Sequence, residues 1–331
     1  MQKRTIGSKG PEVSALGLGL MGMSDFYGGA DESESVRVIH AALDAGIRLL
    51  DTGDFYGSGH NEMLLARALA SASVPRDEVF IQVKFGALRS PDGGFIGFDG
   101  RPVAVKNALA QTLRRLRTDY VDLYMPARLD PTVPIEDTIG AIAECVTAGW
   151  VRHVGLSEVG AETIRRAQAV HPITGLQREY SLITREIEAE VLPTLREIGA
   201  GLTAYGVLSR GLLSGKIRQP SDLQPQDYRA HLPRFQGENL ARNLRLVDAL
   251  VAMAEDKTTT ASQLAIAWAL HRGADVVPLI GARRSEQLSE AVQAVDMTLD
   301  DDEIQRLEAA LSPEDVAGDR YDRFGMAMIG D

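Results

Sequence analysis

The sequence contains a single cysteine, Cys145, among its 331 residues. An intramolecular disulfide is therefore impossible, which excludes a small secreted fold held together by disulfides. The first residues, Met1–Gly7, also lack the apolar core of a signal peptide. On both grounds we expect a protein of the reducing cytoplasm.

Long apolar runs and an excess of positive charge are missing as well. No stretch approaches the roughly 20 apolar residues that a membrane-spanning helix needs. The chain has 46 acidic and 35 basic residues, a formal net charge of −11. Because nucleic acids and anionic membranes are bound by basic surfaces, we expect neither as a partner. An anionic small molecule would need a local cluster of positive charge.

Two common signatures of enzyme sites are also absent. No Gly-x-Gly-x-x-Gly run follows a predicted strand, so a Rossmann dinucleotide-binding domain is not expected. No group of histidines and cysteines has the spacing of a metal site, and we therefore expect no metal ion.

What the chain does have is an alternation of short apolar runs with longer helical stretches. Eight runs read as strands: Gly17–Leu20, Arg48–Asp51, Val79–Lys84, Val121–Tyr124, Val151–Leu156, Gly175–Gln177, Gly201–Tyr205 and Val276–Ile280. Helical patterns lie between and after them: Asp31–Ala45, Asn61–Ser71, Val103–Leu116, Ile135–Ala148, Ala161–Val170, Glu186–Ile198, Thr260–His271 and Ser285–Val292. Asp31, with Glu34 three residues on, has the position of a helix N-terminal cap. Eight strand–helix units without a linker predict an α/β fold, a single (β/α)8 TIM barrel domain over residues 1–331.

Some segments lie outside the eight units. Arg4–Ile6 and Val13–Leu16 predict an N-terminal β-hairpin that closes the barrel floor. The connection after the seventh strand, residues 206–259, is long and contains a predicted helix over Gly237–Ala254. Loops of this length inside compact domains usually serve function.

The chain continues beyond the eighth strand with a C-terminal extra helix, Asp300–Leu311, and then a tail. The tail, Arg320–Ile329, is unusually aromatic and apolar for a terminus. Two interpretations are open. In the first, the tail packs against the side of the barrel or is disordered. In the second, it forms a lid over the substrate.

An acid, a phenol and an amine accompany two successive predicted strands. Asp51 ends the second strand, Tyr56 lies in the loop after it, and Lys84 ends the third. Catalytic groups of such barrels gather at the C-terminal ends of the strands, so these side chains are expected to meet. A buried lysine favours the phenolate of a neighbouring tyrosine, and an aspartate bound to the lysine holds its position. Such a trio can protonate a carbonyl oxygen while hydride reaches the carbon.

The segment around the trio, Asp51-Thr-Gly-Asp-Phe-Tyr-Gly-Ser-Gly-His-Asn-Glu62, resembles the signature of the aldo-keto reductase superfamily. Further matches follow in family order: Val83–Gly86, Leu113–Tyr124, Val154–Glu158, Gln177–Ser181, Ala204–Gly215 and Val277–Arg283. Together the matches extend over nearly the whole chain. The resemblance implies a (β/α)8 barrel that reduces carbonyl groups, with Asp51, Tyr56 and Lys84 as its catalytic residues.

One residue of the family pattern is missing. Members usually carry a histidine after the fourth strand, in a run Asp-Leu-Tyr-Tyr-Gln-His-Arg-x-Asp-Pro, and Ala127 stands in its place here. That histidine would hydrogen-bond the substrate oxygen, a contact of about 1–3 kcal/mol when buried. Four interpretations are open: neutral drift with water in the gap, a pocket enlarged by Ala127 and Pro126, replacement by His60, and cofactor binding without turnover.

The resemblance also implies a cofactor site that ends at the eighth helix. The matching positions are Ser157, Glu158 and Gln177 near the nicotinamide carboxamide, Tyr205 stacked on its ring, Leu208, Arg210 and Gly211 at the pyrophosphate, and Gly281, Arg283, Gln287 and Glu290 at the adenosine. Family members more often have asparagine in place of Glu158. Arg283 would face the 2′-phosphate at a helix N-terminus, where anions bind, and this favours NADPH over NADH.

Residues after the first, third and fourth strands are expected to face the substrate. The candidates are Met21, Met23, Phe26, Tyr27, residues 93–99, Met125, Ala127 and Arg128. Methionine side chains suit adaptable apolar contacts.

The resemblance thus predicts an NADPH-dependent reductase of aldehydes or ketones with Tyr56 as general acid. A weaker similarity, carried by Ala127 and the run Arg128-Leu-Asp-Pro131, is to the pyridoxal-reductase-like branch, and a sugar-derived aldehyde is an equally open substrate. The alternative is a regulatory subunit resembling potassium-channel β subunits, which keep the fold and NADPH but dock on a partner.

Overall fold

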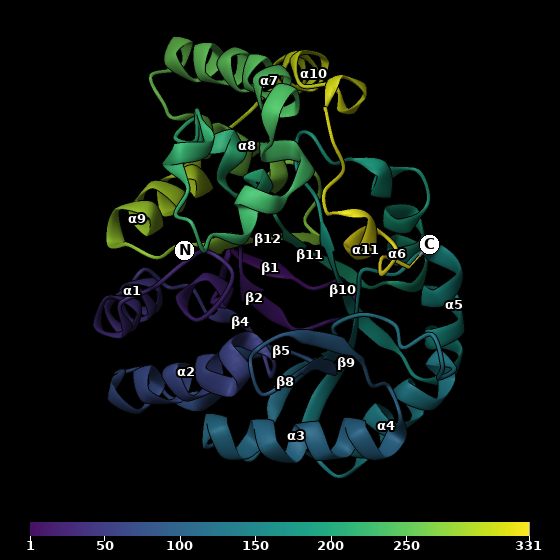
Figure 1. Ribbon diagram of the computed structural model, residues 1–331. Coiled ribbons are helices and arrows are strands. Elements are labelled where there is room, and N and C mark those ends of the chain that lie inside the picture. The colour runs from purple at the N-terminus through teal and green to yellow at the C-terminus, as the bar shows by residue number, and fades with distance from the viewer. Residues whose placement is uncertain (331) are drawn as a thin grey trace.

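The centre of the computed structural model, which describes residues 1–330, is a closed barrel of eight parallel strands (Figure 1). In order around the barrel they are β3 (Gly17–Gly19), β4 (Leu49–Gly53), β5 (Phe80–Phe85), β8 (Val121–Pro126), β9 (Val151–Ser157), β10 (Ile173–Glu179), β11 (Gly201–Tyr205) and β12 (Val276–Gly281). Strand β12 pairs with β3 and closes the ring. The predicted (β/α)8 barrel and its eight strand positions are confirmed.

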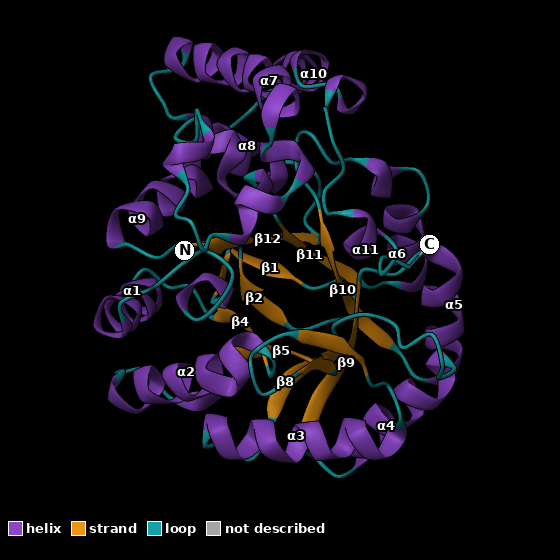
Figure 2. Ribbon diagram, in the orientation of Figure 1, coloured by secondary structure: helices purple, strands orange, loops and turns teal. Residues whose placement is uncertain are grey.

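Helices surround the barrel on its outer side (Figure 2). The eight that follow the barrel strands are α1 (Glu32–Asp44), α2 (His60–Ser71), α3 (Pro102–Leu116), α4 (Ile135–Thr147), α5 (Ala161–Val170), α6 (Val191–Ile198), α8 (Ala261–Leu270) and α9 (Ser285–Gln293). Each turns an apolar stripe inward; α4, for example, buries Ile135, Ile139 and Ile142. None of the helices within residues 1–330 is long and apolar enough to cross a lipid bilayer.

One predicted helix is shorter in the structure. The pattern over Glu186–Ile198 resolves into a 3₁₀ turn, Glu186–Glu188, followed by α6. Helix α6 begins at Val191, which places Pro193 in its first turn. Proline is tolerated there because the N–H groups of the first turn have no partner within the helix.

The inside of the barrel changes character along its axis. Successive residues of a strand point to opposite faces, so Leu49 and Asp51 share the inner face, as do Phe80, Gln82 and Lys84. Apolar side chains fill the lower part of the interior: Ile6, Val13, Leu49, Phe80, Leu123, Met125, Val277 and Leu279. The polar residues on the same inner faces lie nearer the C-terminal ends of the strands. The alternation of residues along each strand therefore gives the barrel an apolar interior at one end and a polar rim at the other.

An N-terminal hairpin closes the floor, as predicted. Strands β1 (Lys3–Thr5) and β2 (Glu12–Ser14) pair antiparallel, and the neighbouring Ile6 is fully buried in the barrel interior. Arg4 donates hydrogen bonds to three backbone carbonyls where α8 ends and β12 begins. These bonds fasten the hairpin to the barrel.

Three insertions build the walls of the opposite end, the mouth. Strands β6 (Ala87–Arg89) and β7 (Phe95–Phe98) form a hairpin after β5, where the sequence indicated only a loop. Residues 206–236 follow β11 in a series of short 3₁₀ turns and lead into α7 (Gly237–Asp256). Helix α10 (Asp301–Ala310) packs beside α7 at one side of the barrel (Figure 1).

The C-terminal tail forms the third wall. After α10 the chain returns to the mouth and ends there with the short helix α11 (Arg323–Met326) (Figure 1). Phe324 of this helix contacts Phe95 of the β6–β7 hairpin edge to face, with ring centroids 5.9 Å apart. The tail thus packs over the mouth instead of lying free.

The N-terminal cap of α1 tests the prediction that Asp31 stabilises the start of this helix. The Asp31 carboxylate accepts a hydrogen bond from the Glu34 N–H at 2.7 Å, as predicted for an N-terminal cap. We expect Asp31→Ala to lower the free energy of unfolding by about 1 kcal/mol, and Asp31→Asn to change it by only a few tenths. Chemical denaturation of the three proteins measures this difference. Equal stability of Asp31→Ala and the wild type would show that the cap contributes nothing.

Candidate active site

The predicted acid, phenol and amine lie together at the rim of the barrel. The Lys84 ammonium contacts both carboxylate oxygens of Asp51, at 2.6 and 2.8 Å, from the neighbouring strand. The Lys84 nitrogen lies 5.2 Å from the centre of the Tyr56 ring. All three residues are at most 5% exposed, so the charge pair lies in a poorly hydrated setting. The strand ends bring these groups together as the sequence indicated.

Two amides also bind the Asp51 carboxylate. Gln177 donates to it at 2.7 Å from β10, and Gln82 donates at 2.9 Å from β5. Gln177 was expected at the cofactor, and here it contacts Asp51 while also lining the cleft above. Gln82 was not predicted, although its position two residues before Lys84 on a strand places both on the inner face. The aspartate is thus held by three donors.

The Tyr56 phenol holds its proton in this setting. Burial raises its pKa well above the ordinary value, the Asp51 charge raises it further, and the Arg128 guanidinium opposes both. Lys84 was expected to acidify the phenol, but its charge is largely offset by the carboxylate that it contacts. The same burial lowers the pKa of Lys84, and Asp51 counteracts that shift. Two cations, Lys84 and Arg128, therefore lie where they can act on Tyr56.

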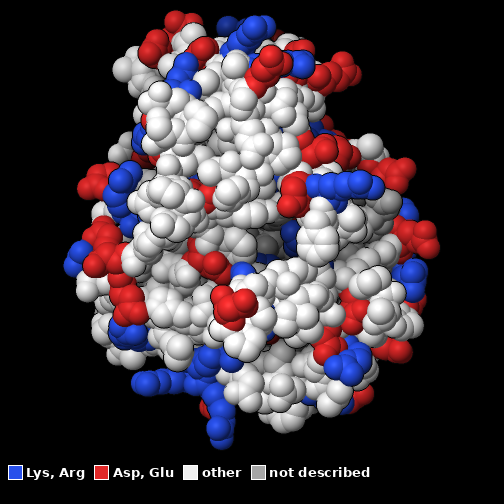
Figure 3. Space-filling view, viewed as in Figure 1, with Lys and Arg blue, Asp and Glu red and all other residues white. Residues whose placement is uncertain are grey.

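A cleft of about 930 Å³ runs from this trio to the start of α9. Figure 3 shows the face that carries the mouth, hollowed near its centre, with acidic and basic side chains interspersed around it. Predicted site residues in the cleft wall are Met21, Phe26, Tyr27, Asp51, Tyr56, Lys84, Phe95, Phe98, Ala127, Arg128, Gln177, Tyr205, Leu208, Arg210, Gly211, Gly281, Arg283, Gln287 and Glu290. Most of the predicted site thus shares one cavity.

Three candidates near the substrate do not reach the cleft. Met23 is 1% exposed and packs in the core between barrel and helices. Met125 fills the barrel interior, because β8 continues to Pro126 and keeps Met125 on its inner face. His60 does not replace the missing histidine, since its ring bonds Ser24 and Glu32 outside the cleft.

Two candidates at the carboxamide position, Ser157 and Glu158, lie beneath the cleft wall. The Ser157 hydroxyl is buried and has no hydrogen-bond partner among the described residues. The Glu158 carboxylate is fully buried and pairs with Arg320 of the tail at 3.2 Å. Burial alone would raise the pKa of Glu158, but Arg320, Arg128 and Arg178 hold it at about 2. In this structure Glu158 therefore anchors the tail.

The tail reaches the residue predicted to stack on the nicotinamide. The hydroxyl groups of Tyr321 and Tyr205 lie 2.8 Å apart, and the Arg128 guanidinium donates to Tyr321 at 3.2 Å. The Arg210 guanidinium lies over the Tyr321 ring, 4.4 Å from its centre. The sequence left two interpretations of the tail open, because these contacts join residues more than 100 positions apart.

The loop after β11 has an unusual backbone. Ser209, Arg210 and Gly211 all have positive φ, at 45°, 56° and 93°. The Arg210 guanidinium lies 2.9 Å from the Glu179 carboxylate, and one of its nitrogens has no well-aligned hydrogen-bond acceptor among the described residues. That nitrogen is the one that faces Glu179, so Arg210 lines the cleft as a cation already neutralised by a carboxylate.

The predicted adenosine end lies at the start of α9. The Arg283 guanidinium donates to the backbone carbonyls of Tyr27 and Gly29, across the cleft on the loop after β3. The Gln287 side chain accepts from the N–H groups of Arg283 and Arg284, at 2.9 and 3.2 Å. Arg283 thus spans the cleft without a carboxylate partner among residues 1–330.

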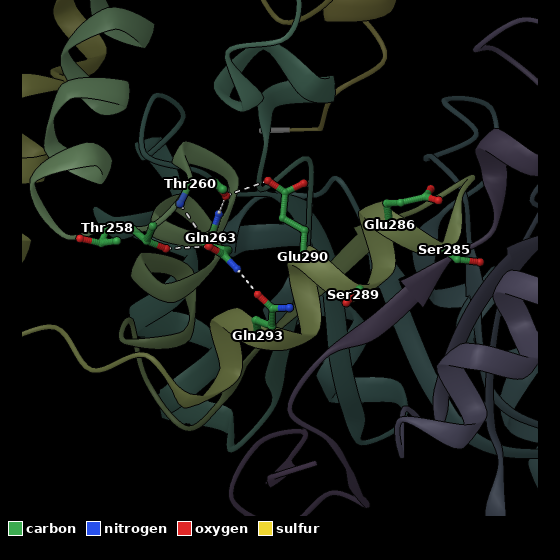
Figure 4. A pocket seen from close by; sticks show the side chains of 9 residues that line it. Thr258, Thr260, Gln263, Ser285, Glu286, Ser289, Glu290 and Gln293 are labelled. Carbon is green, nitrogen blue, oxygen red and sulfur yellow. Dashed lines mark hydrogen bonds between the residues drawn. The ribbon is translucent and has the colours of Figure 1, made fainter.

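Glu290 lies where the cleft meets a second hollow between α8 and α9 (Figure 4). Its carboxylate accepts from Thr260 at 2.7 Å and from Lys216 at 3.0 Å. In Figure 4 Gln263 and Gln293 form another bond across the same two helices, at 2.9 Å. The two bonds fix α9 against α8 and so hold the predicted adenosine residues in place.

The donor set fits an anionic dinucleotide. The unpartnered Ser157 hydroxyl, together with an arginine at a helix start, suits amide and phosphate oxygens. Nothing similar exists for a metal, because no group of three or more histidine, cysteine, aspartate or glutamate side chains suits an ion within the described part of the chain.

A pair of buried carboxyl groups lies behind the catalytic loop. Burial and the neighbouring Glu62 raise the pKa of Asp54 to about 7, and the Gly86 N–H opposes this shift. Burial also raises the pKa of Glu62, which forms an ion pair with Arg115. One oxygen each of Asp54 and Glu62 lacks a partner among the described residues.

This pair predicts a pH dependence of stability. Since Asp54 ionises near 3.8 when unfolded and near 7 when folded, the folded state loses stability as pH rises between these values. We expect Asp54→Asn to remove this loss, so that its apparent melting temperature relative to the wild type rises between pH 5 and pH 8. Exposed Asp119→Asn controls for a lost surface charge. A constant difference between Asp54→Asn and the wild type would contradict the raised pKa.

The sequence and the structure were each compared with those of known proteins, and both comparisons found similar proteins. The family model described as "Aldo/keto reductase family" matches residues 15–312. Similar solved structures include the glycerol dehydrogenase AKR11B4 from Gluconobacter oxydans, 29% identical, with 94% of this chain and 96% of that chain covered and a TM-score of 0.84. The aldo-keto reductase AKR11C1 from Bacillus halodurans, in a holo form, is 29% identical, with coverage of 95% and 97% and a TM-score of 0.78. The thermostable aldo-keto reductase Tm1743, solved with the inhibitor epalrestat, is 28% identical, with coverage of 94% and 100% and a TM-score of 0.75.

Proposed function

The chain belongs to the aldo/keto reductase family, and we propose that it reduces an aldehyde or ketone to an alcohol with NADPH. One observation carries the proposal: the buried Lys84–Asp51 contact lies beside the Tyr56 phenol at the wall of a large cleft. The family and its structural neighbours are oxidoreductases, which agrees with this chemistry.

The reduction of a carbonyl group requires a hydride donor and a proton donor at the mouth. A nicotinamide held at Tyr205 and Gln177 would supply hydride to the carbonyl carbon. Tyr56 gives its proton to the carbonyl oxygen, and the phenolate that remains takes a proton back from solvent. Lys84 and Arg128 stabilise this transient negative charge, while Asp51 fixes Lys84. The raised pKa keeps the phenol protonated, as a proton donor must be.

The preference for NADPH rests on Arg283. Its guanidinium bonds only neutral carbonyl groups within the described chain, so its charge is uncompensated at the predicted adenosine end. A 2′-phosphate would supply the missing negative charge, and NADH lacks that group. The same machinery run backwards oxidises an alcohol, and one neighbour is a glycerol dehydrogenase.

The proton-donor role is tested by Tyr56→Phe, which removes the hydroxyl and keeps the ring. We expect kcat/KM with aldehydes and NADPH to fall at least about 100-fold, because general acid catalysis contributes factors of this size. NADPH binding, followed by fluorescence, is expected to stay within a few-fold. Full activity of the variant would refute the assignment. Tight NADPH binding by the wild type without turnover of any aldehyde would instead favour the regulatory alternative.

The cofactor preference is tested by Arg283→Met. We expect the Kd for NADPH to rise roughly 10- to 100-fold, since a charge-assisted contact to phosphate contributes about 1.5–3 kcal/mol. The Kd for NADH is expected to change much less. Arg284→Met, at the exposed neighbouring residue, is the matched control for a lost arginine. An equal loss for both cofactors would assign Arg283 a role other than phosphate recognition.

A further inference from the structure

Apart from the exposed Arg284, the basic side chains in the cleft wall follow a pattern with two exceptions. Four of them pair with carboxylates: Lys84 with Asp51, Arg89 with Asp25, Arg210 with Glu179 and Arg229 with Asp227. Lys216, on the adenosine side, pairs with Glu290. Within residues 1–330, the arginines of the wall that are at least partly buried and have no carboxylate partner are Arg128 and Arg283.

The two exceptions lie at opposite ends of the cleft. Arg283 is at the end predicted for the adenosine, where the cofactor itself would bring a phosphate. Arg128 is at the catalytic end, next to Ala127 and within the electrostatic reach of Tyr56. Its hydrogen bonds go to two neutral oxygens, the Ala127 carbonyl at 2.6 Å and the Tyr321 hydroxyl at 3.2 Å.

The surroundings of Arg128 add positive charge. Arg210 and Arg320 also lie near the Tyr321 ring, but each has a buried glutamate within 3.2 Å. Arg128 is the member of this group that no carboxylate contacts within the described chain. Glu158 attracts it at longer range but is already paired with Arg320. The guanidinium therefore keeps donors that a bound anion could occupy.

The cleft wall also leaves room for such an anion. Ala127 has only a methyl group where family members usually carry a histidine ring. Tyr321 accepts from Arg128, and where Tyr205 is the donor in the bond between the two hydroxyls, the Tyr321 proton remains to be donated. Arg128 and Tyr321 then present a forked guanidinium and a hydroxyl side by side, a good match for carboxylate or phosphate oxygens.

We propose that the substrate carries a carboxylate or phosphate group close to its carbonyl, and that Arg128 with Tyr321 binds this anion. This substrate class rests on the proposed reductase function and narrows it. The overall charge of −11 would otherwise disfavour anionic substrates, so the local positive site supplies the attraction that the surface lacks.

Matched substrates that differ only by the anion provide the test. The pairs are 4-carboxybenzaldehyde with benzaldehyde, and glyceraldehyde 3-phosphate with glyceraldehyde, each with NADPH. We expect the wild type to favour the charged member of at least one pair by 10-fold or more in kcat/KM, mainly through KM. The pair that shows the preference tells carboxylate from phosphate recognition.

Arg128→Met is expected to lose that preference by 10- to 100-fold, through a rise in KM for the charged member. A weaker stabilisation of the Tyr56 phenolate lowers kcat for both members alike, so the ratio of charged to neutral kcat/KM is the readout. Arg89→Met is the matched control, because Arg89 lines the same cleft but is already neutralised by Asp25 at 2.6 Å. Its ratio of charged to neutral activity is expected to remain that of the wild type.

Several outcomes would overturn the proposal. If the wild type has equal kcat/KM for both members of each pair, the proposal is wrong, and no variant is needed to show it. An equal loss on charged and neutral substrates in Arg128→Met would mean that Arg128 acts on the carbonyl oxygen or on Tyr56 instead.

A binding measurement separates this proposal from the reductase assignment. Benzoate and inorganic phosphate contain no carbonyl to reduce, and one of them is expected to raise the melting temperature of the wild type in the presence of NADPH. The shift is expected to disappear in Arg128→Gln, a second variant that keeps a polar side chain. Absence of turnover on every aldehyde would defeat the reductase function, whereas absence of both anion shifts would defeat the anion site.

Discussion

The contact between the Lys84 ammonium and the Asp51 carboxylate is the constraint on which the site depends. It joins two neighbouring strands inside a barrel where little water can enter, so each charge relies on the other. Loss of one partner from a buried pair typically costs about 3–5 kcal/mol, because the other is left uncompensated. The amides of Gln82 and Gln177 complete the shell and extend it to β10. The Tyr56 phenol therefore lies beside a group of side chains that is fixed in position and nearly neutral in total charge.

Much of this arrangement follows from local pattern. The strands could be placed because parallel barrel strands are short, apolar and separated by amphipathic helices, and the meeting of Asp51 with Lys84 follows from their places at adjacent strand ends. Gln82 could have been found from the two-residue period of β5. Met125 was misplaced because the predicted strand stopped at Tyr124, two residues short of the observed end, and a side chain on a strand faces the interior where one in a loop does not.

Other features depend on contacts that no local pattern encodes. The β6–β7 hairpin contains three glycines and a turn between its short strands, so its pairing gives a weak periodic signal. The pairing of Arg320 with Glu158 joins residues 162 positions apart, and it turns a position expected at the cofactor into an anchor for the tail. The electrostatics of Tyr56 also required coordinates, because its burial and its proximity to Arg128 depend on residues far apart in the sequence.

The edge-to-face contact of Phe95 with Phe324 has a consequence for how ligands enter and leave. It joins the β6–β7 hairpin to the tail at one edge of the mouth, and Phe324 is 62% exposed. An aromatic pair of this kind contributes about 1 kcal/mol. If that contact alone held the edge shut, about one molecule in six would have it parted at any moment. A ligand that crosses this edge would then use an open form that is already well populated. The base of the tail, which Arg320 anchors, would not need to move.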